Sequence, residues 1–149
     1  MRRHTGLIPL SHEHQHALAL CVMTDRALAA NGAEDAVRDA TTNILQAFDS
    51  EILDHFRFEE QVLFPMLTEF DALAALVSEL KAEHVRIIGL VAELRRQAGR
   101  ACVTELCSSL RDHVRKEESV LFEQAQALLS AEQLNGVGDR RAAMLVEPR

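Results

Sequence analysis

Hydrophobic residues recur every three or four positions along most of the chain, which is the spacing of one buried face of an α-helix. No stretch of strict apolar and polar alternation competes with this pattern, so strands are not expected. Turn and capping residues divide the pattern into long helices. Four of them are expected, at about residues 11–30, 34–64, 71–99 and 101–129.

Single residues mark the predicted helix ends. Ser11 is a suitable N-cap for the first helix, and Asn31 and Gly32 form a typical C-terminal stop. Pro65 lacks a backbone donor and is expected to end or kink the second helix, whereas Asp71 can cap the third. The connections are short, so neighbouring helices should be antiparallel, which predicts an all-α, up-down-up-down four-helix bundle.

A different pattern follows the fourth helix. Ser130 to Gln133 resembles a capping box that opens one short helical turn. Gly136 and Gly138 are then expected to release a tail. The length suits one domain over residues 1–149. We expect its bundle core at about 10–129 and the short turn and tail at 130–149, with Arg140, Arg141 and Arg149 as solvated charges.

One ten-residue segment occurs twice. His55–Phe64 and His113–Phe122 are identical at seven of ten positions. In each copy a histidine precedes a glutamate by four residues, His55 before Glu59 and His113 before Glu117, so on a helix both side chains share one face. That face is otherwise apolar, and the pair interrupts the buried stripe.

The other two helices carry a matching pair of residues. The first contains Glu13-His14 and the third contains Glu83-His84, and the stripe around His84 is apolar. Each half of the chain is therefore a helical hairpin that donates two histidines and at least one glutamate. Two such hairpins packed face to face would enclose four histidines and two glutamates.

These carboxylates need a cationic partner. No Lys or Arg lies on either stripe, and Arg57 and Arg115 point elsewhere on their helices. Leaving a carboxylate buried and unpaired costs several kcal/mol, comparable with the stability of a small domain. A metal ion satisfies this requirement most simply. The predicted ligands are His14, His55, Glu59, His84, His113 and Glu117.

Several neighbouring residues leave alternatives open. His12 and His16 share another face of the first helix; His16 could support or join the ligands, and His12 is expected at the surface. Glu60 and Glu118 are expected to face solvent or to bind Arg57 and Arg115, although Glu118 could reach a metal from a locally widened helix. His4 is expected to be solvated.

Composition excludes several classes of protein. The net charge of −7 argues against nonspecific binding to nucleic acids or anionic membranes. No signal peptide and no membrane-spanning run is evident. Three cysteines without a Cys-x-x-Cys pair fit buried thiols in a reducing, cytoplasmic setting.

The ligand set indicates the metal. Four imidazoles and two carboxylates exceed the needs of one tetrahedral zinc ion and suit two ions, each with two histidines and with Glu59 and Glu117 bridging. Iron is favoured, with manganese or zinc as alternatives. Each ion would retain an open position for a small diatomic molecule or peroxide.

The sequence resembles the hemerythrin-like proteins, in particular the HHE cation-binding domain. The resemblance covers about Leu10 to Leu129 and depends on Leu-Ser-His-Glu-His14, on His55-Phe-Arg-Phe-Glu59-Glu, on Glu-His84 and on His113-Val-Arg-Lys-Glu117-Glu. It implies a four-helix bundle around an oxo- or hydroxo-bridged non-haem di-iron centre. Oxygen-carrying members add a fifth histidine on the third helix, where this chain has Leu80 and Ile88 four positions either side of His84.

The resemblance implies a role in handling iron, oxygen, nitric oxide or oxidative stress. We expect a metal-binding protein that senses, scavenges or stores, reporting through a protein partner or a homodimer. The alternative is a di-iron oxidoreductase or peroxide-decomposing enzyme, including a role in iron–sulfur cluster repair, with Glu60, Glu118 or His16 as acid or base. A ferritin-like bundle lacks its usual Glu-x-x-His pairs here. A purely structural bundle would hold no metal.

Overall fold

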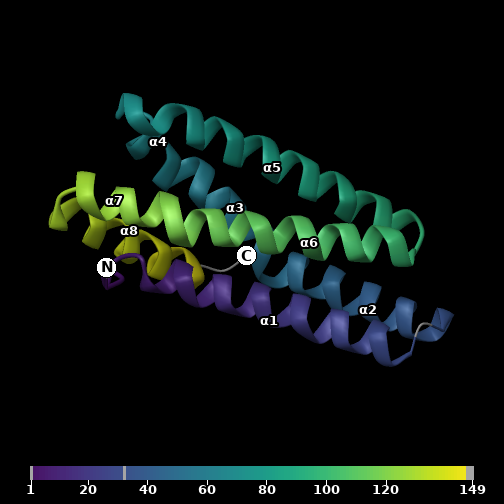
Figure 1. Cartoon of the computed structure of the whole chain (residues 1–149). Coiled ribbons are helices and arrows are strands. Elements are labelled where there is room, and N and C mark those ends of the chain that lie inside the picture. Colours follow the sequence, from purple (N-terminus) through teal and green to yellow (C-terminus); the bar gives the residue numbers. More distant parts are fainter. Residues whose placement is uncertain (1, 32, 147–149) are drawn as a thin grey trace.

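The computed structural model describes residues 2–31 and 33–146, and these residues are helical with short connections and contain no strand. They form five helical rods (Figure 1). The second and fourth rods each combine α-helical and π-helical segments. The rods are α1 (Ile8–Ala30); α2 (Glu34–Ala47), η1 (Phe48–Ile52), α3 (Leu53–Phe58), η2 (Glu59–Leu63) and α4 (Phe64–Leu67); α5 (Asp71–Arg96); α6 (Arg100–Lys116), η3 (Glu117–Leu121) and α7 (Phe122–Leu128); and α8 (Ala131–Val146).

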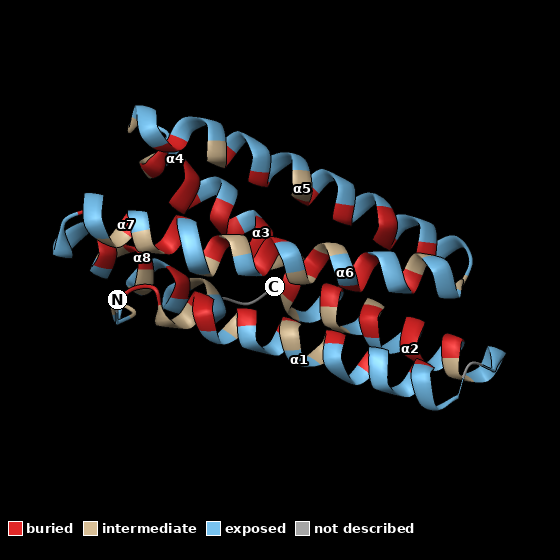
Figure 2. Ribbon diagram, in the orientation of Figure 1, coloured by how far each residue is buried: buried red, intermediate tan, exposed pale blue. Residues whose placement is uncertain are grey.

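The all-α prediction is confirmed, and the four long rods lie alongside one another as in a helical bundle (Figure 1). Their up-down-up-down order stays a prediction. Buried residues follow the faces that the rods turn toward each other, as the helical spacing of the apolar residues requires (Figure 2). No helix in the described ranges is both long and apolar enough to cross a membrane.

The start of α1 differs from the prediction. The helix begins at Ile8 with Pro9 in its first turn, where a proline needs no backbone partner. Ser11 is therefore inside the helix, where its buried hydroxyl donates to both carboxylate oxygens of Glu118 at 3.0 and 2.9 Å. The predicted C-terminal end is correct at Asn31, and Gly32 lies outside the described residues.

Pro65 does not end the second rod. The rod continues to Leu67, and the π-helical segment η2 ends at Leu63, two residues before the proline. A widened turn relieves the clash that a proline ring has with a carbonyl group four residues earlier in a regular α-helix. Asp71 is the first residue of α5, and the residue in capping position is Phe70.

The four histidines separate two apolar clusters. Along α1, for example, His14 lies between Leu10 of one cluster and Ala17 of the other. The same alternation places the remaining histidines at the middle of their rods. The bundle thus holds a polar layer between two hydrophobic ends, and the candidate site is formed there.

The largest correction concerns the C-terminus. The capping box is confirmed, since Ser130 N–H donates to Gln133 Oε1 and Gln133 N–H donates to Ser130 Oγ. The predicted short turn is wrong: α8 has 16 residues and continues through both glycines. It lies against α1 (Figure 1), and its Arg141 is buried, contrary to the expected solvated charge. The end of the predicted tail, including Arg149, lies outside the described residues.

Candidate metal centre

Four rods each place one predicted histidine in the polar layer. His14 lies on α1, His55 on α3, His84 on α5 and His113 on α6, and all four side chains are buried. Their Nε2 atoms meet in pairs, His14 with His55 at 3.0 Å and His84 with His113 at 3.1 Å. The pairs come from the two helical hairpins, as the duplicated sequence pattern predicts.

Glu59 and Glu117, called here the inner glutamates, lie between the two histidine pairs. Both are fully buried, and each is the first residue of a π-helical segment. Glu59 oxygens lie 3.4 Å from Nε2 of His55 and 3.2 Å from Nε2 of His84, and Glu117 Oε1 lies 3.2 and 3.1 Å from Nε2 of His14 and His113. Each inner glutamate thus faces one histidine from either hairpin.

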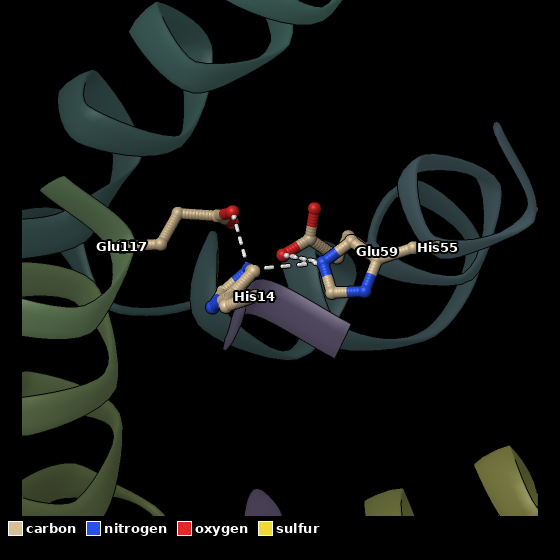
Figure 3. A group of neighbouring side chains, drawn as sticks. All are labelled: His14, His55, Glu59 and Glu117. Atoms are coloured by element: carbon tan, nitrogen blue, oxygen red, sulfur yellow. Dashed lines mark hydrogen bonds and ion pairs between the residues drawn. The ribbon is translucent and has the colours of Figure 1, made fainter. Parts of the chain in front are cut away.

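The six side chains form two groups that share both inner glutamates. One group contains His14, His55, Glu59 and Glu117, and Figure 3 shows these four side chains pointing toward a common centre. The other contains His84 and His113 with the same two carboxylates. Within each group one donor atom from every residue lies within 4.8 Å of the others. All six predicted site residues are therefore brought together.

The inner glutamates have unmet polar atoms. Among the described residues, both oxygens of Glu59 and Oε2 of Glu117 are buried and receive no hydrogen bond. Such groups are rare in proteins, and buried anions without partners are strongly destabilising. A divalent or trivalent cation in each group would meet these oxygens and the four Nε2 atoms. The donor set of each group could therefore hold a metal ion.

Four further carboxylates, called here the outer glutamates, hold the opposite nitrogen of each ring. The Nδ1–H groups of His14, His55, His84 and His113 donate to Glu118, Glu13, Glu60 and Glu83 at 2.7, 2.9, 2.7 and 2.7 Å. This pattern fixes the tautomer that points an Nε2 lone pair at the centre. In this tautomer the lone pairs of two Nε2 atoms face each other at about 3 Å and repel. A cation bound by both atoms removes that repulsion.

The outer glutamates correct the prediction for Glu60 and Glu118. Glu60 is exposed, as predicted, and Glu118 is half-buried, but each accepts a hydrogen bond from a histidine of the other hairpin rather than binding Arg57 or Arg115. The adjacent Glu-Glu and Glu-His pairs were visible in the sequence, but their partners were not. The fourfold repetition of an acidic residue next to a predicted ligand was the available clue.

The sequence suggested a locally widened helix only as an alternative at Glu118, whereas the structure has π-helical turns at both glutamate pairs. In η2 the N–H of Phe64 donates to the carbonyl of Glu59, five residues earlier, and in η3 Phe122 does the same with Glu117. Both η2 and η3 start at two consecutive glutamates, whereas η1 (Phe48–Ile52) does not. The first glutamate of each pair faces the centre and the second reaches a histidine ring. Such turns are frequent at functional sites.

Comparison with known families identifies this arrangement. The profile of the hemerythrin HHE cation-binding domain matches residues 6–125, most of the chain. The chain belongs to the hemerythrin HHE cation-binding family. Neither a curated protein nor a solved structure matches it. The resemblance inferred from the motifs is confirmed at the level of the family.

Ionisation in the HHE domain shows how strongly the centre attracts positive charge. Burial lowers the pKa of His55, but Glu59 and Glu13 more than offset this effect and raise the pKa to about 10. Burial likewise lowers the pKa of His113, but the carboxylates of Glu117, Glu59 and Glu83 more than offset this effect and raise the pKa to about 9. Burial raises the pKa of Glu117, whereas the nearby Glu59, His113 and His14 side chains bring it well below its usual value. These shifts favour protonated His55 and His113 beside an ionised Glu117 when no metal is bound.

A small cavity borders the centre. Its volume is about 10 Å³, roughly what one water-sized molecule occupies. Its apolar walls are Ala17, Ile52, Phe56, Leu110 and Val114, and its polar walls include ligands from both groups. Phe56 stacks on the His84 ring at 4.0 Å between centroids, so aromatic packing also holds the rings in place.

The remaining histidines lie outside both groups. His12 is exposed, as predicted, and His16 is an exposed residue whose Nδ1 pairs with Glu51 at 2.9 Å. His4, expected to be solvated, is half-buried and its Nδ1 accepts from Gly6 N–H. Leu80 is buried and Ile88 is exposed, so no fifth imidazole is supplied from these two positions.

Proposed function

We propose that this HHE domain is a metal-binding protein that holds a non-haem pair of iron ions and interacts with oxygen, nitric oxide or peroxide. Two buried groups of His and Glu side chains share both inner glutamates, and three oxygens of these glutamates accept no hydrogen bond. This arrangement is the observation that supports the proposal. In this proposal His14 and His55 hold one ion, His84 and His113 hold the other, and the inner glutamates bridge them.

The donor chemistry favours iron. Imidazole nitrogens and carboxylate oxygens suit iron or manganese, and no thiolate joins either group. Zinc stays an alternative, because the six donors exceed the needs of one tetrahedral ion but each group by itself offers four. When bound, two iron ions would supply redox chemistry and an exchangeable coordination position. The protein would hold the six donor side chains in place and exclude bulk water from them.

The size of the cavity favours a small ligand. A space of about 10 Å³, lined by apolar side chains and by the predicted ligands, suits a diatomic molecule or peroxide better than an organic substrate. Leu80 and Ile88 replace the fifth histidine of oxygen carriers, so we assign sensing, scavenging or iron handling rather than reversible oxygen transport. A protein partner or a second copy of the chain would receive the output of a sensor.

One observation supports an enzyme as the second candidate. Glu13 borders both the inner cavity and a surface groove of about 630 Å³. A carboxylate at that position can pass protons between solvent and the centre. This arrangement would serve a di-iron oxidoreductase or a peroxide-decomposing enzyme. Repeated consumption of peroxide by the iron-loaded protein would favour the enzyme, and stoichiometric reaction would favour the binding protein.

Absorption spectroscopy tests the proposal. The protein should be loaded anaerobically with ferrous iron, and spectra recorded before and after addition of oxygen, nitric oxide or peroxide. We expect new charge-transfer bands, which are easily seen because the chain has neither Trp nor Tyr. His14→Ala should abolish or strongly weaken the bands. The matched control His16→Ala, an exposed histidine on the same helix, should leave them intact. Identical spectra for the two variants would reject the site.

A further inference from the structure

The C-terminal helix α8 docks through close contact between backbones. A Cβ atom on Gly6 would lie 1.9 Å from the carbonyl oxygen of Leu134, and one on Gly138 would lie 3.0 Å from Gly6. Leu134 and Val137 are buried in the apolar cluster that contains Leu10. The side of α8 that carries these residues is thus fitted closely to the start of the chain. This helix lies beyond the residues that match the family profile.

Arg141 lies at the end of the docked side of α8. Its side chain is 1% exposed, and it is the only buried Lys or Arg in the described part of the chain. Its Nε and Nη2 groups donate to the carboxylate of Glu13 at 3.1 and 2.6 Å, and its guanidinium lies over the ring of Phe58 at 5.4 Å. Two donors and a ring contact fix the guanidinium in one orientation.

Glu13 links Arg141 to the centre. The oxygen that accepts from Arg141 Nε also accepts from His55 Nδ1 at 2.9 Å. Glu13 borders the surface groove, so without Arg141 the carboxylate is free to turn toward solvent. His55 would then lose the acceptor that fixes its tautomer and ring orientation.

The other half of the pocket is built differently. Glu83, the outer glutamate of His113, is bound by Lys116, and these two side chains are 25% and 29% exposed. Lysine is a flexible point charge, and solvent screens an exposed pair much more than a buried one. Arg141, a buried cation, therefore supports the His14–His55 group through Glu13. Among the described residues, no buried Lys or Arg does the same for the His84–His113 group.

We propose that Arg141 is a positioning residue for the metal position formed by His14 and His55, and that docking of α8 makes the two metal positions inequivalent. This inference rests on the proposed metal site. Docked α8 strengthens binding at the first position through Glu13 and His55. By reciprocity, metal at that position stabilises the docked helix.

A titration with Co²⁺ under anaerobic conditions tests the inference, because visible absorption follows each bound ion. His55→Ala and His113→Ala assign the binding steps to the two positions. Arg141→Met should weaken the His14–His55 step about 10-fold or more and change the other step by less than about threefold. Arg141→Lys should recover part of the loss. The matched control Arg140→Met removes an exposed charge from the same helix and should change neither step.

Hydrogen exchange on the unmodified protein gives a second readout that does not depend on variants folding. Amides in 131–146 should exchange more slowly when Co²⁺ is bound. Unchanged exchange in α8, or an equal loss at both positions in Arg141→Met, would overturn the inference and leave the metal site standing. If the unmodified chain binds no Co²⁺ and no iron, both the inference and the proposed function are wrong.

Discussion

At the scale of single residues, the centre consists of histidines whose two nitrogens have separate partners. Nδ1 of His55 donates to Glu13, and its Nε2 faces His14 and Glu59. The carboxylates raise the pKa of His55 to about 10 and that of His113 to about 9, which favours the protonated rings near neutral pH when no metal is bound. Metal ions and protons thus compete for the same nitrogens.

This competition predicts how the stability of the metal-free protein depends on pH. A histidine whose folded pKa exceeds its unfolded value of about 6.5 stabilises the fold fully below that pH, and this stabilisation is lost as the pH rises through the folded value. The free energy of unfolding should therefore fall by at least about 1 kcal/mol between about pH 6.5 and pH 10. Urea denaturation of chelator-treated protein measures the change.

The control for this prediction is His55→Gln, which cannot take up the proton. Its unfolding free energy should decline less over the same range, because one of the two strongly shifted histidines is absent. A steeper decline in the variant, or stability of the unmodified protein that rises with pH, would contradict the assigned protonation.

At the scale of elements, local sequence predicted most helices but not their irregularities. Helical spacing and capping residues indicated the four long rods, and the duplicated motif placed His55 and His113 at equivalent positions. The π-helical turns were suggested only at Glu118, because a single turn with hydrogen bonds over five residues has no capping or turn residue that marks it in the sequence. Helix α8 escaped prediction because Gly136 and Gly138 disfavour helices locally, whereas its docking against Gly6 is a tertiary contact.

The two glycines of α8 give a paired prediction. Gly136→Ala should raise the free energy of unfolding by about 0.5–1 kcal/mol, because nothing lies within 4 Å of the added methyl group and alanine favours the helix. Gly138→Ala should lower it by about 1–3 kcal/mol, because its methyl group meets the backbone of Gly6 at 3.0 Å. Chemical denaturation compares the same substitution at two positions of one helix. A stabilising effect at both positions would show that the helix does not dock in this way.

At the scale of the whole molecule, the fold holds six polar side chains in an apolar interior. Sequence reasoning found the six because an imidazole and a carboxylate interrupted stripes that should be buried. It could not find the outer glutamates or Arg141, since their partners lie on other helices and depend on packing. The two apolar clusters and α8 stabilise a layer that costs free energy when no cation is present.

The iron content of the chain tests this account most directly. Protein loaded anaerobically with ferrous iron and freed of excess should contain two iron ions per chain by elemental analysis. His55→Ala and His113→Ala should each hold clearly less, because each removes a donor from a different group. A folded protein without bound iron, or variants that keep the iron content of the unmodified chain, would contradict the central claim.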